Sequence, residues 1–299
     1  RRLPASERVV HRHRGQAWGL IFTTEKFKKK APVTAPFLWK FGDIHMIDIE
    51  RHGVCAVIRF NRPDALNALN ANGLDALEGA LAHISKSDAR ALILTGVGDR
   101  AFCAGADINE LGPRTADQVR SASRRGQAIG LRIEHLPFPS IALLNGYALG
   151  GGLELSLACT FRLATPNAMM GFPEIKLGIC TGWGGTQRLP RLIPLQAALD
   201  LLMSGRLIDA TKAKELGLVH SITDGDPMSA AIEFAEQFTR NTLPAMGLVR
   251  EAVLRANEQN LESGFRTESD LSTLSYQLDD SAEGVAAFLG KRKPNFQDR

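Results

Sequence analysis

The chain has 299 residues, of which 44% are hydrophobic and 23% charged, so it is long enough for one large core plus an appended segment. No stretch approaches the roughly 20 consecutive apolar residues of a membrane-spanning helix, which argues against an integral membrane protein. The four cysteines are scattered and no histidine lies at metal-ligand spacing from them, so we predict neither a disulfide framework nor a zinc site.

The formal net charge of +4 is unevenly distributed along the chain. Residues 1–43 carry ten Lys and Arg against three Asp and Glu, a balance of +7, whereas residues 44–299 carry 26 against 29, a balance of −3. The body of the chain therefore does not predict the basic face of a nucleic-acid-binding protein, and we expect no nucleic-acid partner.

Residues 1–43 show no sustained helical or strand period and are interrupted by prolines. We expect a basic, poorly ordered extension without a function, and a plausible domain begins at Met46. Because the segment is rich in arginine and poor in acidic residues, a transit peptide is the alternative. The scattered cysteines favour a reducing compartment, so we expect the cytoplasm, or the mitochondrial matrix if the segment is a transit peptide.

Strands and helices then alternate along the chain. Residues 54–60 are rich in β-branched side chains and predict a strand. A helix follows, because apolar residues recur at spacings of three and four in the set Leu74, Leu77, Leu81 and Ile84. Residues 91–96 and 139–146 are short apolar runs that end in turn residues, which is typical of buried strands.

The second half of the pattern becomes increasingly helical. Residues 102–111 begin as a glycine-containing loop and are predicted to become helical near Asp107, and residues 161–165 predict one more strand. After about residue 226 the pattern is helical only, and this tail is too thin for a core of its own, so it should pack on the body or on another subunit. The alternation indicates the α/β class and by itself suggests a doubly wound sheet.

Glycine-rich loops follow two of the predicted strands. In ALGGGLELSLA, residues 148–158, a glycine triplet opens a helix, where backbone N–H groups lack intrahelical partners and a ligand can approach closely. Residues 102–108, FCAGADI, repeat this arrangement. The two loops could converge on one oxygen, as enolate or tetrahedral-intermediate chemistry requires. The alternatives are close packing for the glycines and a helix N-cap for Asp107.

Two carboxylates stand in apolar surroundings. Glu154 follows the glycine triplet on an otherwise apolar helix, and Glu174 follows a proline in MGFPEIKLGI. Burial of two carboxylates raises at least one pKa towards values useful for proton transfer near pH 7. Each residue alone is equally compatible with a charge at a helix start or in a surface loop. The phosphate and dinucleotide motifs GxxxxGK[ST] and GxGxxG are absent.

Several segments, in order, resemble the enoyl-CoA hydratase/isomerase (crotonase) family: NRPDALNALN, LILTGVGDRAFCAGADINEL, PSIALLNGYALGGGLELSLAC, GFPEIKLGICTGWGGTQRLPRLI, ALDLLMSGRLIDATKAKELGLV and EGVAAFLGKRKPNF. The resemblance implies an α/β fold made of a spiral of ββα units over residues 44–240, followed by a helical trimerisation region over residues 241–299. It also implies a homotrimer or a hexamer.

The resemblance further implies a site for an acyl-CoA thioester. The N–H groups of Ala106 and Gly151 would hold the thioester oxygen as an enolate develops. Glu154 would activate a water molecule and Glu174 would exchange the proton of the α-carbon. The other positions that match substrate-binding residues of the family are Ala65, Asp107, Ile108, Asn109, Phe288 and Lys291.

The resemblance thus predicts an enoyl-CoA hydratase, which adds water in a syn sense to a trans-2-enoyl-CoA and needs neither a metal nor a redox cofactor, since CoA is part of the substrate. The alternatives are Δ3-Δ2-enoyl-CoA isomerisation, or another acyl-CoA reaction, and a non-catalytic acyl-CoA-binding or assembly protein. The chain departs from the family pattern at three positions: Asn109 replaces a common Lys, Thr160 a common Asp, and Trp183 a small residue. The bulk of Trp183 leaves the preferred acyl-chain length open.

Overall fold

The computed structural model describes residues 46–110 and 112–299. The predictions for residues 1–43, as an extension or a transit peptide, lie outside the described residues. In the described part of the chain, no helix has both the length and the apolar character needed to cross a membrane.

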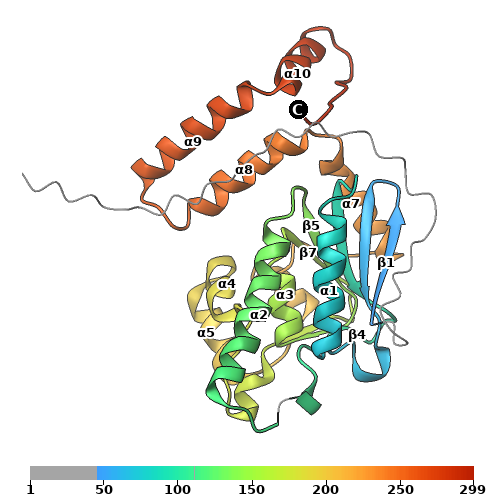
Figure 1. The fold of residues 1–299 in the computed structure, drawn as a ribbon, viewed down its shortest axis with the longest axis vertical. Coiled ribbons are helices and arrows are strands. Elements are labelled where there is room, and N and C mark those ends of the chain that lie inside the picture. Colours follow the sequence, from blue (N-terminus) through green and yellow to red (C-terminus); the bar gives the residue numbers. More distant parts are fainter. Residues whose placement is uncertain (1–45, 111) are drawn as a thin grey trace, which may run out of the picture. The chain divides into compact units, whose positions relative to one another are not determined.

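The larger of two sheets has six strands (Figure 1). β1 pairs antiparallel with β2, and every later neighbour in this sheet is parallel. The spatial order is β1 (Ile47–His52), β2 (Cys55–Phe60), β3 (Ala91–Gly96), β5 (Ser140–Leu144), β7 (Phe161–Ala164) and β10 (Ser221–Ile222).

Three strands of the smaller sheet directly follow β3, β5 and β7 in sequence, and its fourth strand, β9, comes after α5 (Leu195–Ser204). Its order is β4 (Ala101–Cys103), β6 (Tyr147–Leu149), β8 (Met169–Gly171) and β9 (Ile208–Asp209). After each such pair of strands the chain enters a helical segment: α2 (Ala116–Glu134), α3 (Gly151–Leu157), or the 3-10 helix η3 (Pro173–Leu177) with α4 (Gly185–Leu192). These are the ββα units that the family resemblance implies, and the doubly wound sheet suggested by alternation alone is wrong.

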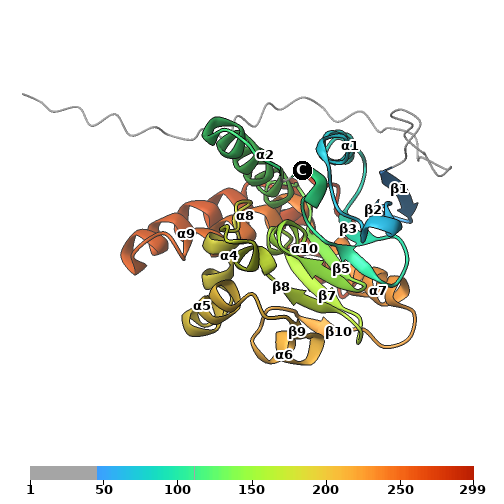
Figure 2. The same ribbon diagram turned by 90° about the horizontal axis from the view of Figure 1, so that it is seen from below.

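The central strands of the larger sheet are buried on both faces, and successive residues of a strand point to opposite faces. In β3, Leu92 and Leu94 belong to the larger core cluster, which includes residues of α1 (Ala71–Ile84), α2 and α3. Ala91 and Ile93 pack on the other side, with Ala231 and Ala235 of α7 (Pro227–Thr239). Figure 2 shows α7 across the sheet from α1.

The remaining elements are shorter or lie away from the sheets. They are η1 (Pro63–Ala65), η2 (Ile108–Glu110), α5 (Leu195–Ser204), α6 (Ala210–Glu215), α8 (Leu243–Arg255), α9 (Leu261–Tyr276) and α10 (Asp279–Leu289). α8, α9 and α10 form an arm beyond the end of the sheet (Figure 1), and neither α8 nor α9 buries a residue. From residue 227 the described chain forms only helices, as predicted, up to the end of α10 at Leu289, and the last residues are not helical. The boundary between residues 240 and 241 stays a prediction.

The helix predicted near Asp107 is wrong in extent. Only the three residues of η2 are helical there, and α2 begins later, at Ala116. The start of α2 is fixed by a capping box, in which the Thr115 side chain accepts from Gln118 N and the Gln118 side chain accepts from Thr115 N. The segment after Asp107 therefore stays a loop, with Asp107 capping only the short turn.

Candidate active site

The glycines at the start of α3 are required by close approach of other parts of the chain. Gly150 has a φ of 49°, and a Cβ on it would overlap the Glu174 carboxylate. A Cβ on Gly152 would overlap the carbonyl of Cys103 in β4. Gly151 lies between these two contacts as the first residue of α3, where its N–H has no intrahelical partner.

The loop after β4 meets the glycine triplet directly. Gly105 has a φ of 88°, and a Cβ on it would lie 2.8 Å from the Gly151 nitrogen. A parallel bridge joins Ala106 to Leu69, whose N–H donates to the Gly105 carbonyl (2.8 Å) and whose carbonyl accepts from Asp107 N–H (2.9 Å). In such a bridge, the N–H of Ala106 itself points away from Leu69.

Two backbone donors are thereby left available at one place. Among the described residues, neither Ala106 N–H nor Gly151 N–H donates a backbone hydrogen bond. The predicted convergence of the two loops is thus present in the fold, and the same glycines also serve close packing. The part that these two N–H groups play in binding an oxygen stays a prediction.

Glu154 is buried in the first turn of α3, with 2% of its surface exposed. Its Oε1 accepts hydrogen bonds from Gly185 N (2.6 Å) and Trp183 N (2.8 Å). Burial raises the pKa of Glu154 above its ordinary value, and these two hydrogen bonds oppose the rise. The carboxylate is therefore held in a fixed orientation by one backbone donor from the loop that precedes α4 and one from the first residue of α4.

Glu174 lies in η3, directly after Pro173, and its carboxylate sits over Gly150. Burial raises the pKa of Glu174 from its ordinary value of 4.5 to about 7, and the charge of Glu154 adds to the rise. The Glu174 Oε2 atom is buried and has no hydrogen-bond partner. A buried polar atom without a partner is costly, so this oxygen is suited to holding a proton or a bound molecule.

Trp183 packs between α2 and α3 on the same side as Glu154. A Cβ on Gly151 would lie 2.6 Å from its Cε3 atom, and a Cβ on Gly126 of α2 would overlap its five-membered ring. The Trp183 carbonyl accepts from Arg188 Nη1 (3.0 Å), and Arg188 forms a two-pronged ion pair with Glu134 at 2.7 and 2.9 Å. The loop is therefore anchored to α2 by both a ring and a charge pair.

The other predicted site residues after β4 have different surroundings. The Asp107 side chain forms a hydrogen-bonded ion pair with Arg62 and accepts from Asn109 N (3.0 Å) and Asn109 Nδ2 (2.9 Å). The guanidinium of Arg62 holds the pKa of Asp107 below its ordinary value. Ile108 is 66% exposed, and Ala65 is half-buried at the end of η1.

Phe288 and Lys291 are not brought to these residues within one chain. Phe288 is 83% exposed on α10, and Lys291 is exposed just after this helix. α10 lies with α8 and α9 in the arm, away from α3 and α4 (Figure 1). Their predicted contact with CoA therefore requires a second copy of the chain or a movement of the arm.

Two residues near the site, Arg62 and Asn67, make structural contacts that the sequence did not predict. Arg62 pairs with Asp107, as described above. Asn67 has a φ of 58° and is 1% exposed; its Oδ1 accepts from Arg62 N (2.9 Å) and its Nδ2 donates to Ala101 O (2.7 Å). Both residues belong to the segment NRPDALNALN, whose asparagines and proline indicated a turn but no contact with the site.

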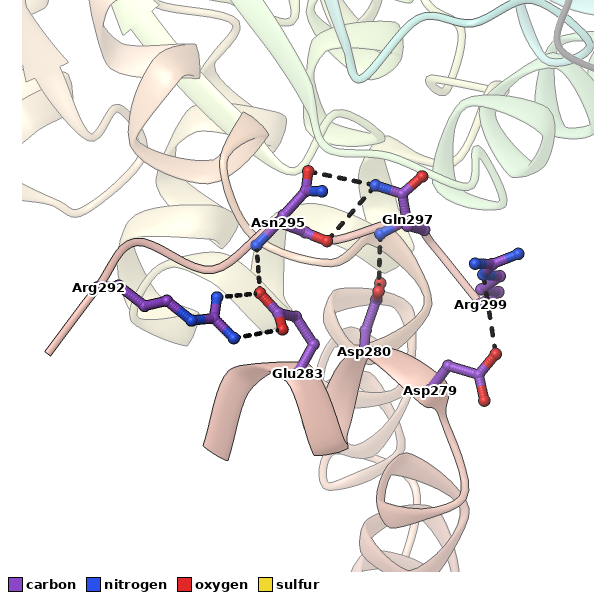
Figure 3. Close-up of a pocket in the computed structure, with 7 residues that line it drawn as sticks. All are labelled: Asp279, Asp280, Glu283, Arg292, Asn295, Gln297 and Arg299. Carbon is purple, nitrogen blue, oxygen red and sulfur yellow. Dashed lines mark hydrogen bonds and ion pairs between the residues drawn. The ribbon is translucent and has the colours of Figure 1, made fainter. Parts of the chain in front are cut away.

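A separate cavity of about 450 Å³ lies beside α10 (Figure 3). It is lined by Asp279, Asp280, Glu283, Arg292, Asn295, Gln297 and Arg299, and none of the predicted site residues. Its charged groups bind one another: Glu283 pairs with Arg292 at 2.6 and 2.8 Å, and Asp280 accepts from Gln297 N and Asp298 N, both at 2.7 Å. Over the described ranges, no three His, Cys, Asp or Glu residues are grouped to hold a metal ion.

Comparison with known proteins points to one family. The family model described as Enoyl-CoA hydratase/isomerase matches residues 50–299. A short-chain-enoyl-CoA hydratase of Clostridium acetobutylicum is 36% identical over 253 residues, which is 84% of this chain and 97% of that protein. A crotonyl-CoA hydratase of Syntrophomonas wolfei is 37% identical over 252 residues, again 84% of this chain and 97% of that protein. The crystal structure of an enoyl-CoA hydratase from Bacillus anthracis has a TM-score of 0.81 and 38% identity, covering 85% of this chain and 100% of that one.

Proposed function

The chain belongs to the enoyl-CoA hydratase/isomerase family, and on this premise we propose that it adds water to a trans-2-enoyl-CoA to give a 3-hydroxyacyl-CoA. The family resemblance and the crotonase-like α/β fold are confirmed by the comparisons. The single observation that carries the proposal is a pair of glutamates at the start of α3: Glu154 is buried, and the half-buried Glu174, whose carboxylate packs over Gly150, has its pKa raised by burial and by the charge of Glu154. They stand next to two backbone N–H groups that donate no hydrogen bond among the described residues.

The proposed reaction begins with the thioester oxygen bound to Ala106 N–H and Gly151 N–H. A water molecule held by Glu154 and Glu174 adds its oxygen to the β-carbon and gives a proton to Glu154. The electrons of the double bond move to the thioester oxygen, where the two donors stabilise the enolate. Glu174 then gives its proton to the α-carbon, and transfer of a proton from Glu154 to Glu174 restores the starting state.

The environments of the two acids support this division of roles. A pKa of about 7 leaves Glu174 partly protonated at neutral pH, so it is able to donate a proton. Two backbone N–H groups stabilise the charged form of Glu154, so it is better suited to accept the proton of water. Neither step uses a metal or a redox cofactor, and activity that survives dialysis against EDTA would support this part of the proposal.

We propose in addition a homotrimer or a hexamer as the working assembly. The support is the exposed apolar surface of the arm, together with the distance of Phe288 and Lys291 from the site of their own chain. In such an assembly, α10 of one copy would contact CoA held by another copy. We propose the cytoplasm as the location, or the mitochondrial matrix if residues 1–43 are a transit peptide, and the free cysteines of the described residues are compatible with both.

The direct test is hydration of crotonyl-CoA by the purified full chain, measured as loss of absorbance of the conjugated thioester. We expect turnover that depends on enzyme concentration and is abolished by heat. Folded protein that hydrates no short or medium trans-2-enoyl-CoA would contradict the proposal. Conversion of 3-enoyl-CoA to 2-enoyl-CoA without hydration would instead identify an isomerase.

Substitution of Glu174 by Gln tests the proposed proton donor. We expect Glu174→Gln to lower kcat by about 10²–10⁴-fold, because an amide cannot donate a carboxyl proton to the α-carbon. Binding of a saturated acyl-CoA, measured by calorimetry, should change little. Glu233→Gln, at an exposed position of α7, is the matched control and should retain full turnover. Near-normal kcat in Glu174→Gln would refute the assigned role.

A further inference from the structure

The loop between η3 and α4 places a tryptophan, Trp183, in the proposed site. Trp183 is 9% exposed, and its backbone N–H donates to Glu154 Oε1 at 2.8 Å. The position of its backbone is therefore tied to one proposed acid. Its ring extends from there across the first turn of α3.

The ring lies directly beside one of the proposed oxyanion donors. A Cβ on Gly151 would lie 2.6 Å from Cε3 and 2.7 Å from Cζ3 of Trp183, so the six-membered ring contacts the Gly151 Cα. The N–H of Gly151, the first residue of α3, donates no backbone hydrogen bond among the described residues. A thioester bound to this N–H would have the indole as its immediate neighbour.

The opposite side of the ring is closed by α2. A Cβ on Gly126 would lie 2.6 Å from Cδ2 of Trp183 and would overlap Cγ and Cδ1. One turn further along α2, a Cβ on Gly130 would lie 2.9 Å from Arg188 Nη2. The two glycines thus form a recess on α2 that receives the Trp183 indole from the loop and the Arg188 guanidinium from α4.

From this packing, and resting on the proposed hydratase function, we infer that Trp183 sets the acyl-chain specificity: it closes the acyl end of the site and restricts the enzyme to short-chain enoyl-CoA substrates. The oxygen, the α-carbon and the β-carbon of the substrate must lie between Gly151 and the two glutamates. Carbons beyond the β-carbon must then pass the indole, which fills the space between α2 and α3. A short chain ends before this wall, whereas a long chain meets it.

The test compares kcat/KM for trans-2-enoyl-CoA substrates with acyl chains of C4, C6, C8 and C10. For the wild-type chain, kcat/KM should fall steeply with length. Trp183→Ala should raise the ratio of C8 to C4 by about tenfold or more, since one methylene that gains or loses its place in a pocket changes kcat/KM by roughly 10–200-fold. Trp183→Phe, which keeps a smaller ring between the same glycines, should give an intermediate ratio.

The ratio separates specificity from a general loss of activity, because damage to the donor at Gly151 would lower kcat/KM for all chain lengths together. Binding of butyryl-CoA and decanoyl-CoA by calorimetry gives a second readout that does not depend on turnover, and Trp183→Ala should favour decanoyl-CoA. If Trp183→Ala does not fold, as judged by circular dichroism, the wild-type length profile and Trp183→Phe carry the test.

The outcomes distinguish this inference from the proposed function. An active wild-type enzyme that hydrates C10 as well as C4 would overturn the inference and leave the hydratase intact. An unchanged C8 to C4 ratio in folded Trp183→Ala or Trp183→Phe would overturn it as well. Absence of hydration at every chain length would instead contradict the proposed function itself.

Discussion

At the scale of single residues, the central feature is a carboxyl group whose surroundings disfavour its charge. Glu174 packs over Gly150, its Oε2 has no hydrogen-bond partner, and burial together with the Glu154 charge raises its pKa to about 7. The same surroundings that make it a proton donor must reduce the stability of the folded chain once the group ionises.

This coupling predicts a pH-dependent stability difference between the wild type and Glu174→Gln. Below its ordinary pKa of 4.5, Glu174 is neutral in both the folded and the unfolded chain. Between 4.5 and about 7 the unfolded chain ionises first, so the wild type loses stability as the pH rises through this range. The Gln variant should therefore gain up to roughly 3 kcal/mol relative to the wild type between pH 4 and pH 8.

Urea unfolding at pH 4, 6 and 8 measures this difference in unfolding free energy. Glu233→Gln, an exposed carboxylate to amide change on α7, should show no comparable trend with pH. A difference between Glu174→Gln and the wild type that stays constant over the whole range would show that Glu174 titrates as an ordinary surface carboxyl.

At the scale of elements, the loop between β4 and α2 is held by a charge pair rather than by a helix. The buried Asp107 carboxylate is bound by Arg62 from the loop after β2 and by both nitrogens of Asn109. The neighbouring residue is Ala106, whose N–H is one of the two proposed donors. The predicted contact of Asp107 with substrate stays a prediction, and these contacts suit the side chain to positioning the loop.

A double-mutant cycle of Asp107→Asn and Arg62→Gln separates the two roles. If the pair positions the loop, each single variant should lower kcat more than it raises KM. The two changes should also be coupled in unfolding free energy by about 0.5–3 kcal/mol, because each removes the partner of the other. An Asp107→Asn variant with a raised KM, an unchanged kcat and unchanged stability would favour direct substrate contact.

Elements with a clear period of apolar residues were predictable from the sequence. The helix that packs against the loop of the proposed site, α2, was not predicted. α1 and β3 match their predictions because their inward positions are consistently apolar. No helix was predicted over α2, although it has 19 residues. Two of its four buried positions are glycines, Gly126 and Gly130, so the helical period of apolar side chains is weak in the sequence. Glycine is needed there because Trp183 and Arg188 pack against these positions.

The site residues divide in the same way. Glu154, Glu174 and the glycine triplet were found because a carboxylate in an apolar run and three consecutive glycines are unusual in a sequence. The contacts of Arg62 and Asn67 were not found, because they join segments that are distant in sequence and neither residue type is unusual in a turn. Proximity of Glu154 and Glu174 likewise depends on the two sheets, which no local pattern specifies.

At the scale of the whole molecule, the arm leaves a large apolar surface uncovered in a single chain. The exposed apolar residues of α8, α9 and α10 include Val249, Val253, Leu254, Leu261, Phe265, Leu274, Val285, Phe288 and Leu289. Large exposed apolar patches are uncommon on monomeric proteins and mark interaction surfaces, so we expect these side chains to be covered by a partner. In the proposed assembly, other copies of the same chain cover this surface.

Light scattering coupled to size-exclusion chromatography measures this assembly. We expect a trimer or a hexamer for the wild type and a shift to smaller species for Val253→Asp, because a charge buried in an apolar interface costs several kcal/mol. Asn257→Asp, which adds the same charge at an exposed polar position just beyond α8, is the control and should leave the mass unchanged. A monomeric wild type would contradict the proposed assembly.

The contact of Trp183 with Gly126 and Gly151 has a consequence on the evolutionary timescale. While position 183 carries an indole in this place, a side chain at position 126 or 151 would overlap the ring, so the indole or a helix would have to shift. A descendant lineage that exchanged Trp183 for a small residue would free position 126 to diversify at once, whereas position 151 would remain constrained by its place at the helix start. We therefore expect a side chain at position 126 only in chains that carry a small residue at position 183.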